Sequence, residues 1–251
     1  MCGRFTLKTP VADWLADLFP NWLKVTEQGS AFGSTLESGT GELARARYNI
    51  APSQQIVVAY CSDLGVPTFA SMRWGLVPVW ADSLSAGYNM INARSESLAE
   101  KPSFRPSLIS KRCVVFADGY YEWKKVSPKN KEPYWIHTSG ERVFAMAGLW
   151  AENKKIQSGQ GTPIRSATII TTASNADVID VHDRMPAILF DEEHIASWLD
   201  PSLNNDASIH CLLHQLRPSP LGALSLRRVS TLVNSPSNDV AELVSKAVSQ
   251  S

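Results

Sequence analysis

Runs of apolar and β-branched residues, four to eight residues long, recur through the middle of the chain. They predict strands at 55–60, 67–74, 113–117, 120–124, 134–137, 143–150 and 166–172. Two polar stretches that contain glycine, at 28–42 and 152–163, lie between the apolar segments. We expect both to be surface loops, and the second to be the loop of a long hairpin.

Apolar residues at helical spacing occur mainly toward the two ends of the chain. They predict helices at 11–19, which stops at Pro20, and at 191–199, 207–216 and 239–248. Many short strands with a few peripheral helices are typical of an α+β fold built around curved, mostly antiparallel sheets. No internal repeat or shift in composition marks a boundary, so we expect a single domain over 1–251.

Composition supports a sizeable folded core, since 44% of the residues are hydrophobic and eight are Trp. Lys and Arg together number 24, as do Asp and Glu, so a nucleic-acid partner would need a local basic patch. No apolar run approaches the ~20 residues of a membrane span. No secretory signal pattern is visible either, so we expect a cytoplasmic protein that does not contact a membrane.

Cysteine and histidine spacing gives no disulfide framework and no zinc pattern, because no C-x-x-C pair is present. Cys113 lies in an apolar strand and is predicted to be a core residue. His210 and His214 lie four apart on a predicted helix, a spacing that can hold a metal ion. With no third ligand placed beside them, we assign no metal site and expect no cofactor.

Position 2 carries the most distinctive chemistry. A small second residue such as Cys2 permits removal of Met1, which leaves a thiol and a free α-amine on adjacent carbons. An α-amine titrates near ~8 and a thiol near ~8.5, so both are partly deprotonated at neutral pH and both can be nucleophiles. One residue can then attack a carbonyl first as an amine and then as a thiolate. From position alone, an incidental second residue is an equal alternative.

Three further polar clusters interrupt apolar or aromatic stretches. Asn92 offers a neutral donor and acceptor, and Arg94 beside it offers a fork suited to phosphate. Glu122 lies between aromatic residues, which can raise its pKa toward pH 7, although a salt-bridged strand Glu fits equally well. His182 lies on a loop bounded by proline and can carry protons, unless it is a structural or solvated histidine. With Cys2, these side chains form the set that carbonyl addition requires.

The sequence resembles the SRAP-domain family, which senses abasic sites in single-stranded DNA and crosslinks to them. The matching segments come in the family's order: MCGR at 1–4, YNIAP at 48–52, MRWGLVP at 72–78, NARSE at 92–96, FR at 104–105, RC at 112–113, ADGYYEW at 117–123, AMAGLW at 145–150, TIITT at 168–172 and HDRMP at 182–186. The loop after residue 28 and the far C-terminus match least. The resemblance implies a barrel-like core with peripheral helices, in a protein of the bacterial type associated with the nucleoid.

The resemblance also implies a role for each reactive residue. The amine of Cys2 would form a Schiff base with the aldehyde of an opened abasic sugar, and its thiolate would close this to a thiazolidine, a stable DNA–protein crosslink. Glu122 would be the acid/base for ring opening and imine formation. His182 would assist proton transfer, including strand scission of the lyase type or crosslink reversal. Asn92 would orient the reacting groups.

DNA binding is expected to use residues next to these positions. Arg4, Arg94 and Arg184 are the predicted phosphate ligands. Trp80 and Trp123 are predicted to stack on bases or wedge between them, a contact that tolerates any sequence. The expected partner is single-stranded DNA with an abasic site, including junctions with duplex, bound by a monomer without an obligate protein partner.

Trp74 and Trp150 are expected to pack in the core.

Three alternative functions remain open. Glutamine amidotransferases also begin at a processed Cys followed by Gly, but this N-terminal-nucleophile alternative gives Glu122 and His182 no role. A thiol peptidase, in its mildest form removing Met1 from itself, is a related alternative. A non-catalytic DNA-binding module is the third, and it would tolerate loss of the Cys2 side chain.

Overall fold

The computed structural model describes residues 2–10, 14, 18, 45–62, 67–159 and 161–247. Within these residues, five strands close into a barrel in which each strand pairs with the next and the last returns to the first. In spatial order they are β6 (Arg112–Ala117), β3 (Gln55–Cys61), β4 (Pro67–Trp74), β10 (Pro163–Ala173) and β9 (Phe144–Gln157). Only the β4–β10 pairing in this ring is parallel.

Three short strands extend the barrel sheet near the predicted reactive residues. They are β5 (Asn92–Arg94) and β11 (Arg184–Pro186), which both pair with β10, and β12 (Ile188–Leu189), which pairs with β9. β5 and β11 lie on either side of the end of β10, where Thr171 pairs with both Arg94 and Pro186, so segments far apart in the sequence are brought together there.

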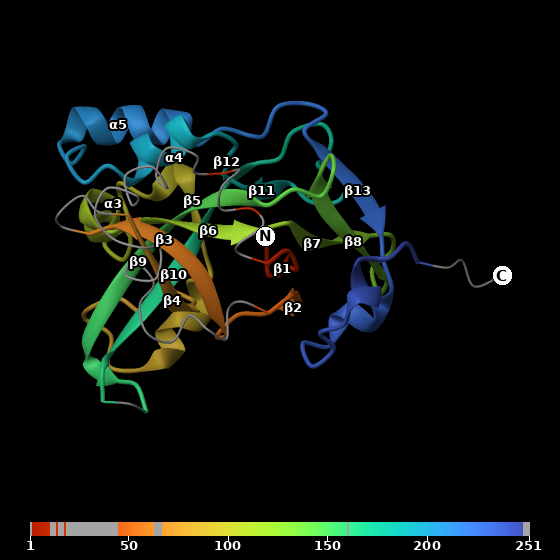
Figure 1. Ribbon diagram of the computed structural model, residues 1–251, viewed down its shortest axis with the longest axis horizontal. Helices are drawn as coiled ribbons and strands as arrows, with labels where there is room; N and C mark the ends of the chain where they lie inside the picture. The colour runs from red at the N-terminus through yellow and green to blue at the C-terminus, as the bar shows by residue number, and fades with distance from the viewer. Residues whose placement is uncertain are drawn as a thin grey trace.

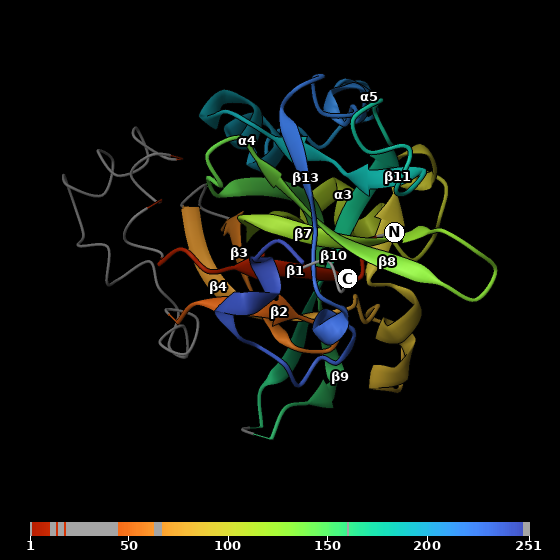
Figure 2. The same ribbon diagram turned by 90° about the vertical axis from the view of Figure 1, so that its right-hand side faces the viewer.

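A second sheet is entirely antiparallel. Its strands, in spatial order, are β13 (Leu224–Arg228), β8 (Lys131–Thr138), β7 (Gly119–Lys125), β1 (Arg4–Leu7) and β2 (Arg47–Ile50). In Figure 1 this sheet lies to the right of the barrel, and Figure 2 views it from that side. The chain passes from β6 of the barrel into β7 of the second sheet through one residue, Asp118.

Three α-helices lie outside the barrel, at the upper left of Figure 1. The α-helices are α3 (Arg105–Ser110), α4 (Glu192–Leu199) and α5 (Asp206–Gln215), and the short 3-10 helices are η3 (Leu84–Asn89), η4 (Ser95–Ser97), η5 (Thr231–Asn234) and η6 (Ala241–Val244). The buried guanidinium of Arg112 donates to the carbonyl oxygens of Trp198 (2.6 Å) and Leu108 (2.8 Å), which fixes α4 and α3 to the barrel wall. The predicted α+β fold with a barrel-like core is confirmed.

Core positions agree with the apolar pattern of the strands. Cys113, Trp74 and Trp150 are buried, as predicted, with at most 5% of each side chain exposed. Phe5 packs edge-on against Trp74 with ring centroids 5.0 Å apart, so the second sheet and the barrel share one core.

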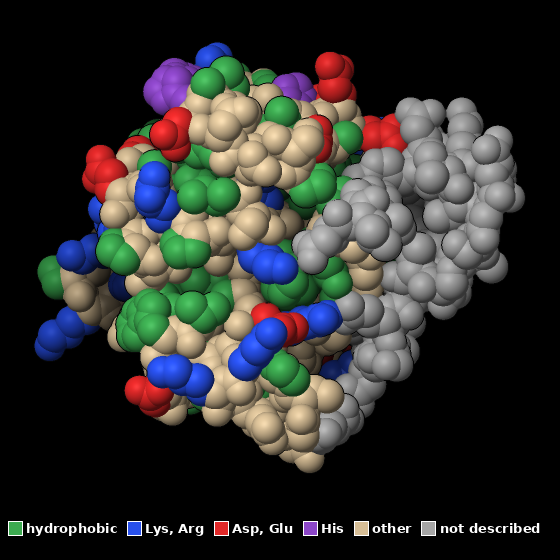
Figure 3. All heavy atoms as spheres, turned by 90° about the vertical axis from the view of Figure 1, so that its left-hand side faces the viewer, with side chains coloured by type: hydrophobic (Ala, Val, Ile, Leu, Met, Phe, Trp, Pro, Cys, Tyr) green, Lys and Arg blue, Asp and Glu red, His purple; other side chains and the backbone are tan. Residues whose placement is uncertain are grey.

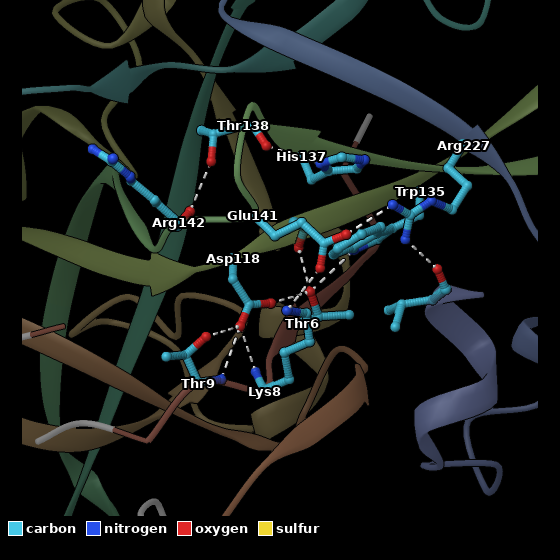
Figure 4. Close-up of polar contacts among 12 residues, drawn as sticks. Thr6, Lys8, Thr9, Asp118, Trp135, His137, Thr138, Glu141, Arg142 and Arg227 are labelled. Carbon is cyan, nitrogen blue, oxygen red and sulfur yellow. Dashed lines mark hydrogen bonds and ion pairs between the residues drawn. The ribbon is translucent and has the colours of Figure 1, made fainter. Parts of the chain in front are cut away.

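The carboxylate of Asp118 anchors the far end of β1. It accepts hydrogen bonds from the Thr6 hydroxyl (2.6 Å) and from the backbone N–H groups of Lys8 (2.7 Å) and Thr9 (2.9 Å), as Figure 4 shows. A buried carboxylate is stable only when such donors surround it, so β1 cannot shift along β7 without losing them. This contact fixes the position at which Cys2 enters the sheet.

A cavity of about 1280 Å³ lies next to this anchor. Its polar lining includes an acidic side chain, Glu141, which pairs with Lys8 (3.1 Å) and Arg227 (2.7 Å). None of the residues that the sequence predicted as catalytic or DNA-binding lines this cavity.

Two predicted elements are corrected by the structure. The strand predicted at 143–150 continues to Gln157, so most of the 152–163 loop is a strand hairpin held by β9–β10 pairing. The side chain of Asn153 supports it by donating to the carbonyl oxygen of Pro78 at 2.7 Å. The helix predicted at 239–248 is wrong over its described residues, where only η6 forms, because the Asp239 carboxylate binds the backbone N–H of Asn49 (3.0 Å).

The remaining sequence predictions concern parts of the chain that are only partly described. The predicted helix at 11–19 lies outside the described residues apart from Trp14 and Leu18, and the predicted loop at 28–42 lies outside them entirely. In the described ranges, each helix is too short or too polar to cross a membrane.

Candidate reaction site

Cys2 lies immediately before β1 and is fully buried. The side-chain Nδ2 of Asn92 donates to the backbone carbonyl oxygen of Cys2 at 2.7 Å. The Cys2 thiol donates to the carbonyl oxygen of Arg4, with Sγ and O 3.8 Å apart. Asn92 is itself held in β5 by pairing with Ile169 of β10, so the barrel positions the start of the second sheet.

Glu122 reaches the same region from β7. The register of β1 with β7 pairs Arg4 with Tyr121, so the residues just before Arg4 run alongside Glu122. Only 3% of Glu122 is exposed. Burial raises its pKa to about 7, and the positive amino terminus of the chain partly opposes that rise. Of the two possibilities that the sequence left open, burial favours the raised pKa, with which the carboxyl can both give and take a proton near neutral pH.

The thiol of Cys2 behaves differently from the sequence expectation of a partly ionised group. Burial raises the pKa of this thiol well above its ordinary range, and the charge of Glu122 raises it further. The positive amino terminus opposes both effects only in part. With Met1 in place, the thiol is therefore protonated in the unbound protein.

His182 lies on the loop between β10 and β11. The backbone N–H of Arg184 donates to its Nδ1 at 3.0 Å, which places the proton of the neutral ring on Nε2. Asp183 lies 3.0 Å from the same nitrogen, but its side chain is 80% exposed and free to turn away. Burial lowers the pKa of His182, and the positive amino terminus lowers it further, so the ring is neutral at pH 7 and can accept a proton.

Arg184 joins the segments that carry Asn92 and His182. Its guanidinium forms a bidentate ion pair with Glu96, at 2.6 and 2.9 Å, and donates to the carbonyl oxygen of Thr171 at 2.6 Å. The hydrogen bond from Arg184 is the main reason that the pKa of Glu96 is lowered. In the unbound protein, the Arg184 side chain is thus mostly buried and its charge is compensated.

Arg4 and Trp123 bind the segment around η5. Arg4 donates through Nη1 to the side chain of Asn49 and to the carbonyl oxygen of Val233, both at 2.8 Å. The indole N–H of Trp123 donates to the side chain of Asn234 at 2.8 Å, and the Arg4 guanidinium lies over the Trp123 ring. Both side chains therefore hold the C-terminal part of the chain against the second sheet.

Trp80 and Arg94, in contrast, are exposed in this structure. Trp80 is 55% exposed, and Val79 and Tyr88 in the same segment are exposed to a similar degree, at 59% and 60%. Arg94 lies at the exposed end of β5, two residues after Asn92. Of the five predicted DNA contacts, these two side chains are thus accessible without rearrangement, while the role of all five in DNA binding stays a prediction.

Tyr120 is a neighbour of the site that the sequence analysis did not single out. It lies two residues before Glu122 in β7, so alternation places both on one face of the sheet. Its hydroxyl is fully buried and has no hydrogen-bond partner among the described residues. Burial raises the pKa of Tyr120 well above its usual range, and the charges of Cys2 and Glu122 raise it further. The same alternation, read from the sequence, was the signal that could have identified it.

Comparison with known proteins gives a consistent result. The profile of the family described as SOS response associated peptidase (SRAP) matches residues 1–236. A Bacillus subtilis (strain 168) protein named abasic site processing protein YoqW is 41% identical over 244 residues, which cover 97% of this chain and 99% of that protein. The abasic site processing protein HMCES of Xenopus tropicalis is 30% identical, covering 99% of this chain and 79% of that protein. A crystal structure of a Bacteroides thetaiotaomicron protein superposes with a TM-score of 0.73 at 26% identity, covering 98% of this chain and all of that one.

Proposed function

This chain belongs to the SRAP family, and from that premise we propose that it binds abasic sites in single-stranded DNA and links to them covalently through Cys2. The relatives named as abasic site processing proteins support abasic DNA as the partner. The observation that carries the covalent step is the placement of Cys2, held by Asn92 at 2.7 Å and next to a carboxyl whose pKa is about 7.

The reaction starts at the α-amine that removal of Met1 frees on Cys2. An abasic deoxyribose in its open form carries an aldehyde, and the amine adds to this carbon to give a carbinolamine. Glu122 in its protonated form donates to the departing hydroxyl, so that water leaves and an imine forms. Because the pKa of Glu122 is about 7, the same group can accept the proton that the amine releases.

Ring closure then uses the thiol. The Sγ–H group of Cys2 adds across the C=N bond, so that a carbon–sulfur bond forms and the proton ends on nitrogen. The product is a thiazolidine, and the step neither oxidises nor reduces any group. Because burial raises the pKa of this thiol, sulfur has to give up its proton as it bonds to carbon, and the imine nitrogen takes that proton.

His182 and Asn92 have separate roles in this scheme. Asn92 keeps the Cys2 main chain in place while its side chain reacts. Neutral His182 accepts a proton in the Schiff-base steps, including strand scission and reversal of the crosslink. The exposed Arg94 and Trp80 provide a phosphate ligand and a stacking surface, and single strands or junctions suit the reaction because the sugar there is already accessible.

The test uses untagged protein whose mature N-terminus is confirmed by intact mass. It is mixed with single-stranded DNA that carries one abasic site, and the products are separated on a denaturing gel beside Cys2→Ala. We expect a heat-stable shifted band for wild type and none for the variant. An equal band in both proteins, or no band in either, would refute the proposed reaction, and glutamine hydrolysis and non-covalent DNA binding would then be measured.

A further inference from the structure

Two histidine side chains converge on the surface of α5. His210 and His214 are one helical turn apart, so they lie on the same face of the helix. Their Nε2 atoms are 3.0 Å apart, and their ring centroids are 4.6 Å apart. Both side chains are exposed, and Figure 3 shows histidines at the top of the molecule, the edge along which α5 lies in Figure 1.

A separation of 3.0 Å suits a metal ion bound by both nitrogens. With metal–nitrogen bonds of about 2.0–2.1 Å, this separation gives an angle of about 91–97° at the metal. Neighbouring ligands in square-planar or octahedral coordination have this angle, whereas tetrahedral Zn²⁺ needs one of about 109°. The geometry therefore favours Cu²⁺ and Ni²⁺ over Zn²⁺.

The helix that carries the two histidines is fixed to the rest of the protein by its buried apolar residues and its N-terminal cap. Ile209 and Leu212 are buried beneath it, with 7% and 1% of their surface exposed. The side chain of Asn205 caps its N-terminus by accepting from the backbone N–H of Ser208 at 2.9 Å. Because the backbone is fixed, binding a metal ion would order only the two imidazole rings, and little conformational entropy would be lost.

We propose that His210 and His214 form a two-histidine site for a late first-row divalent cation, with Cu²⁺ and Ni²⁺ preferred. No third His, Cys, Asp or Glu completes a ligand group here among the residues that the structure describes, so water fills the remaining positions. The site is independent of the proposed reaction, since α5 runs along the top edge in Figures 1 and 2 while β1 lies near the centre. The sequence showed only the spacing, and the structure adds the convergence of the two Nε2 atoms.

The alternative is a hydrogen bond between two neutral rings, in which one Nε2–H donates to the other nitrogen. The two possibilities differ in what added metal does. We would titrate untagged protein with Ni²⁺ by isothermal calorimetry, beside His210→Ala and His214→Ala. His194→Ala is the matched control, because His194 is also exposed on a neighbouring helix but is paired with Asp191.

Wild type and His194→Ala should bind one Ni²⁺ with the same affinity. Each of the other two variants should bind it ten- to a hundred-fold more weakly, on the order expected when a chelate becomes a single ligand. Cu²⁺ should bind more tightly than Ni²⁺ and Zn²⁺. Its EPR spectrum should show coupling to two nitrogens, and it is recorded on a Cys211→Ser background because Cys211 is an exposed free thiol on α5.

The proposal is overturned if wild type shows no one-to-one Ni²⁺ site, or if both alanine variants bind as wild type does. Circular dichroism of each variant checks that α5 remains folded. Since both side chains are exposed, we expect their substitution to leave the fold unchanged.

Discussion

The side-chain amide of Asn92 donates a hydrogen bond to the carbonyl oxygen of Cys2 at 2.7 Å. Asn92 belongs to β5, at the edge of the barrel sheet, whereas Cys2 leads into β1 of the second sheet. This contact therefore joins the two sheets at the residue that we propose as the nucleophile. It also means that the orientation of Cys2 depends on strands that lie more than 80 residues further along the chain.

Asn92→Asp tests this contact, because it keeps the shape of the side chain but replaces the donor with an acceptor. Two oxygens would then face each other, so we expect a loss of about 1–3 kcal/mol in the free energy of unfolding. Crosslinking to abasic DNA should slow at least about tenfold, since a misplaced nucleophile loses its alignment. Urea unfolding and gel kinetics measure both effects. Asn204→Asp, at an exposed loop position, is the control, and equal losses in the two variants would contradict the assignment.

Glu122→Gln tests proton transfer by the buried carboxyl. Because the pKa of Glu122 is about 7, both of its protonation states are populated at neutral pH. The amide of Gln cannot exchange a proton in this range, so crosslinking should slow by about 10²–10⁴ and lose its pH dependence near pH 7. Single-turnover rates from pH 5 to pH 9 provide the measurement. Glu132→Gln on the neighbouring β8 is the control, and a wild-type profile in Glu122→Gln would exclude the acid/base role.

The same carboxyl makes the stability of the protein depend on pH. The pKa of Glu122 is about 7 in the folded state against an ordinary 4.5, so between these values the folded protein retains a proton that the unfolded chain has lost. The free energy of unfolding should therefore fall by on the order of 3 kcal/mol as the pH rises from 4.5 to 7, and then level off. Glu122→Gln, which stays neutral, should melt above wild type at pH 8, with the gap closing toward pH 4.5. Parallel melting curves for the two proteins would show that burial does not shift this group.

Cys2→Ser separates the two nucleophiles of the proposed reaction. The variant keeps the α-amine but lacks the thiol, so it should form an imine that hydrolyses in the gel. Added borohydride should trap that imine as a stable band, whereas wild type should need no reductant. An adduct of Cys2→Ser that survives heating without borohydride would argue against ring closure by sulfur.

Glu96→Gln tests how the charge of Arg184 is used. The Glu96 carboxylate compensates that guanidinium in the unbound protein, through contacts of 2.6 and 2.9 Å. Its neutralisation should leave Arg184 with an uncompensated positive charge, so affinity for single-stranded DNA should rise. The slope of log affinity against log salt concentration should become steeper by about one unit, because one more counterion is released. Fluorescence anisotropy over a salt series measures this. Glu100→Gln, at an exposed position nearby in sequence, should change neither quantity, and an unchanged slope in Glu96→Gln would mean that Arg184 does not meet phosphate.

Local sequence patterns predicted the elements that carry their own apolar periodicity or capping residue. The strand predicted at 67–74 has the bounds of β4, and the helix predicted at 191–199 begins at the Asp191 that caps α4. Both signals act within a few residues, so they can be read without knowing the fold. Patterns of this kind fail where partners are distant. The short strands β1, β2 and β13 were not predicted because each is defined by its neighbours in the sheet. The helix predicted at 239–248 does not form over its described residues, where Asp239 instead binds the backbone of Asn49.

The sequence by itself determined which groups are available for chemistry: a cysteine at position 2, an amide at Asn92, a carboxyl at Glu122 and an imidazole at His182. It also determined the family, through short motifs in a fixed order. Only the tertiary structure decided the state of these groups. Burial protonates the thiol of Cys2 and raises the pKa of Glu122 to about 7, and ion pairing occupies Arg184. Such effects depend on which distant segments exclude water from a side chain or neutralise it, and adjacency along the chain does not encode that.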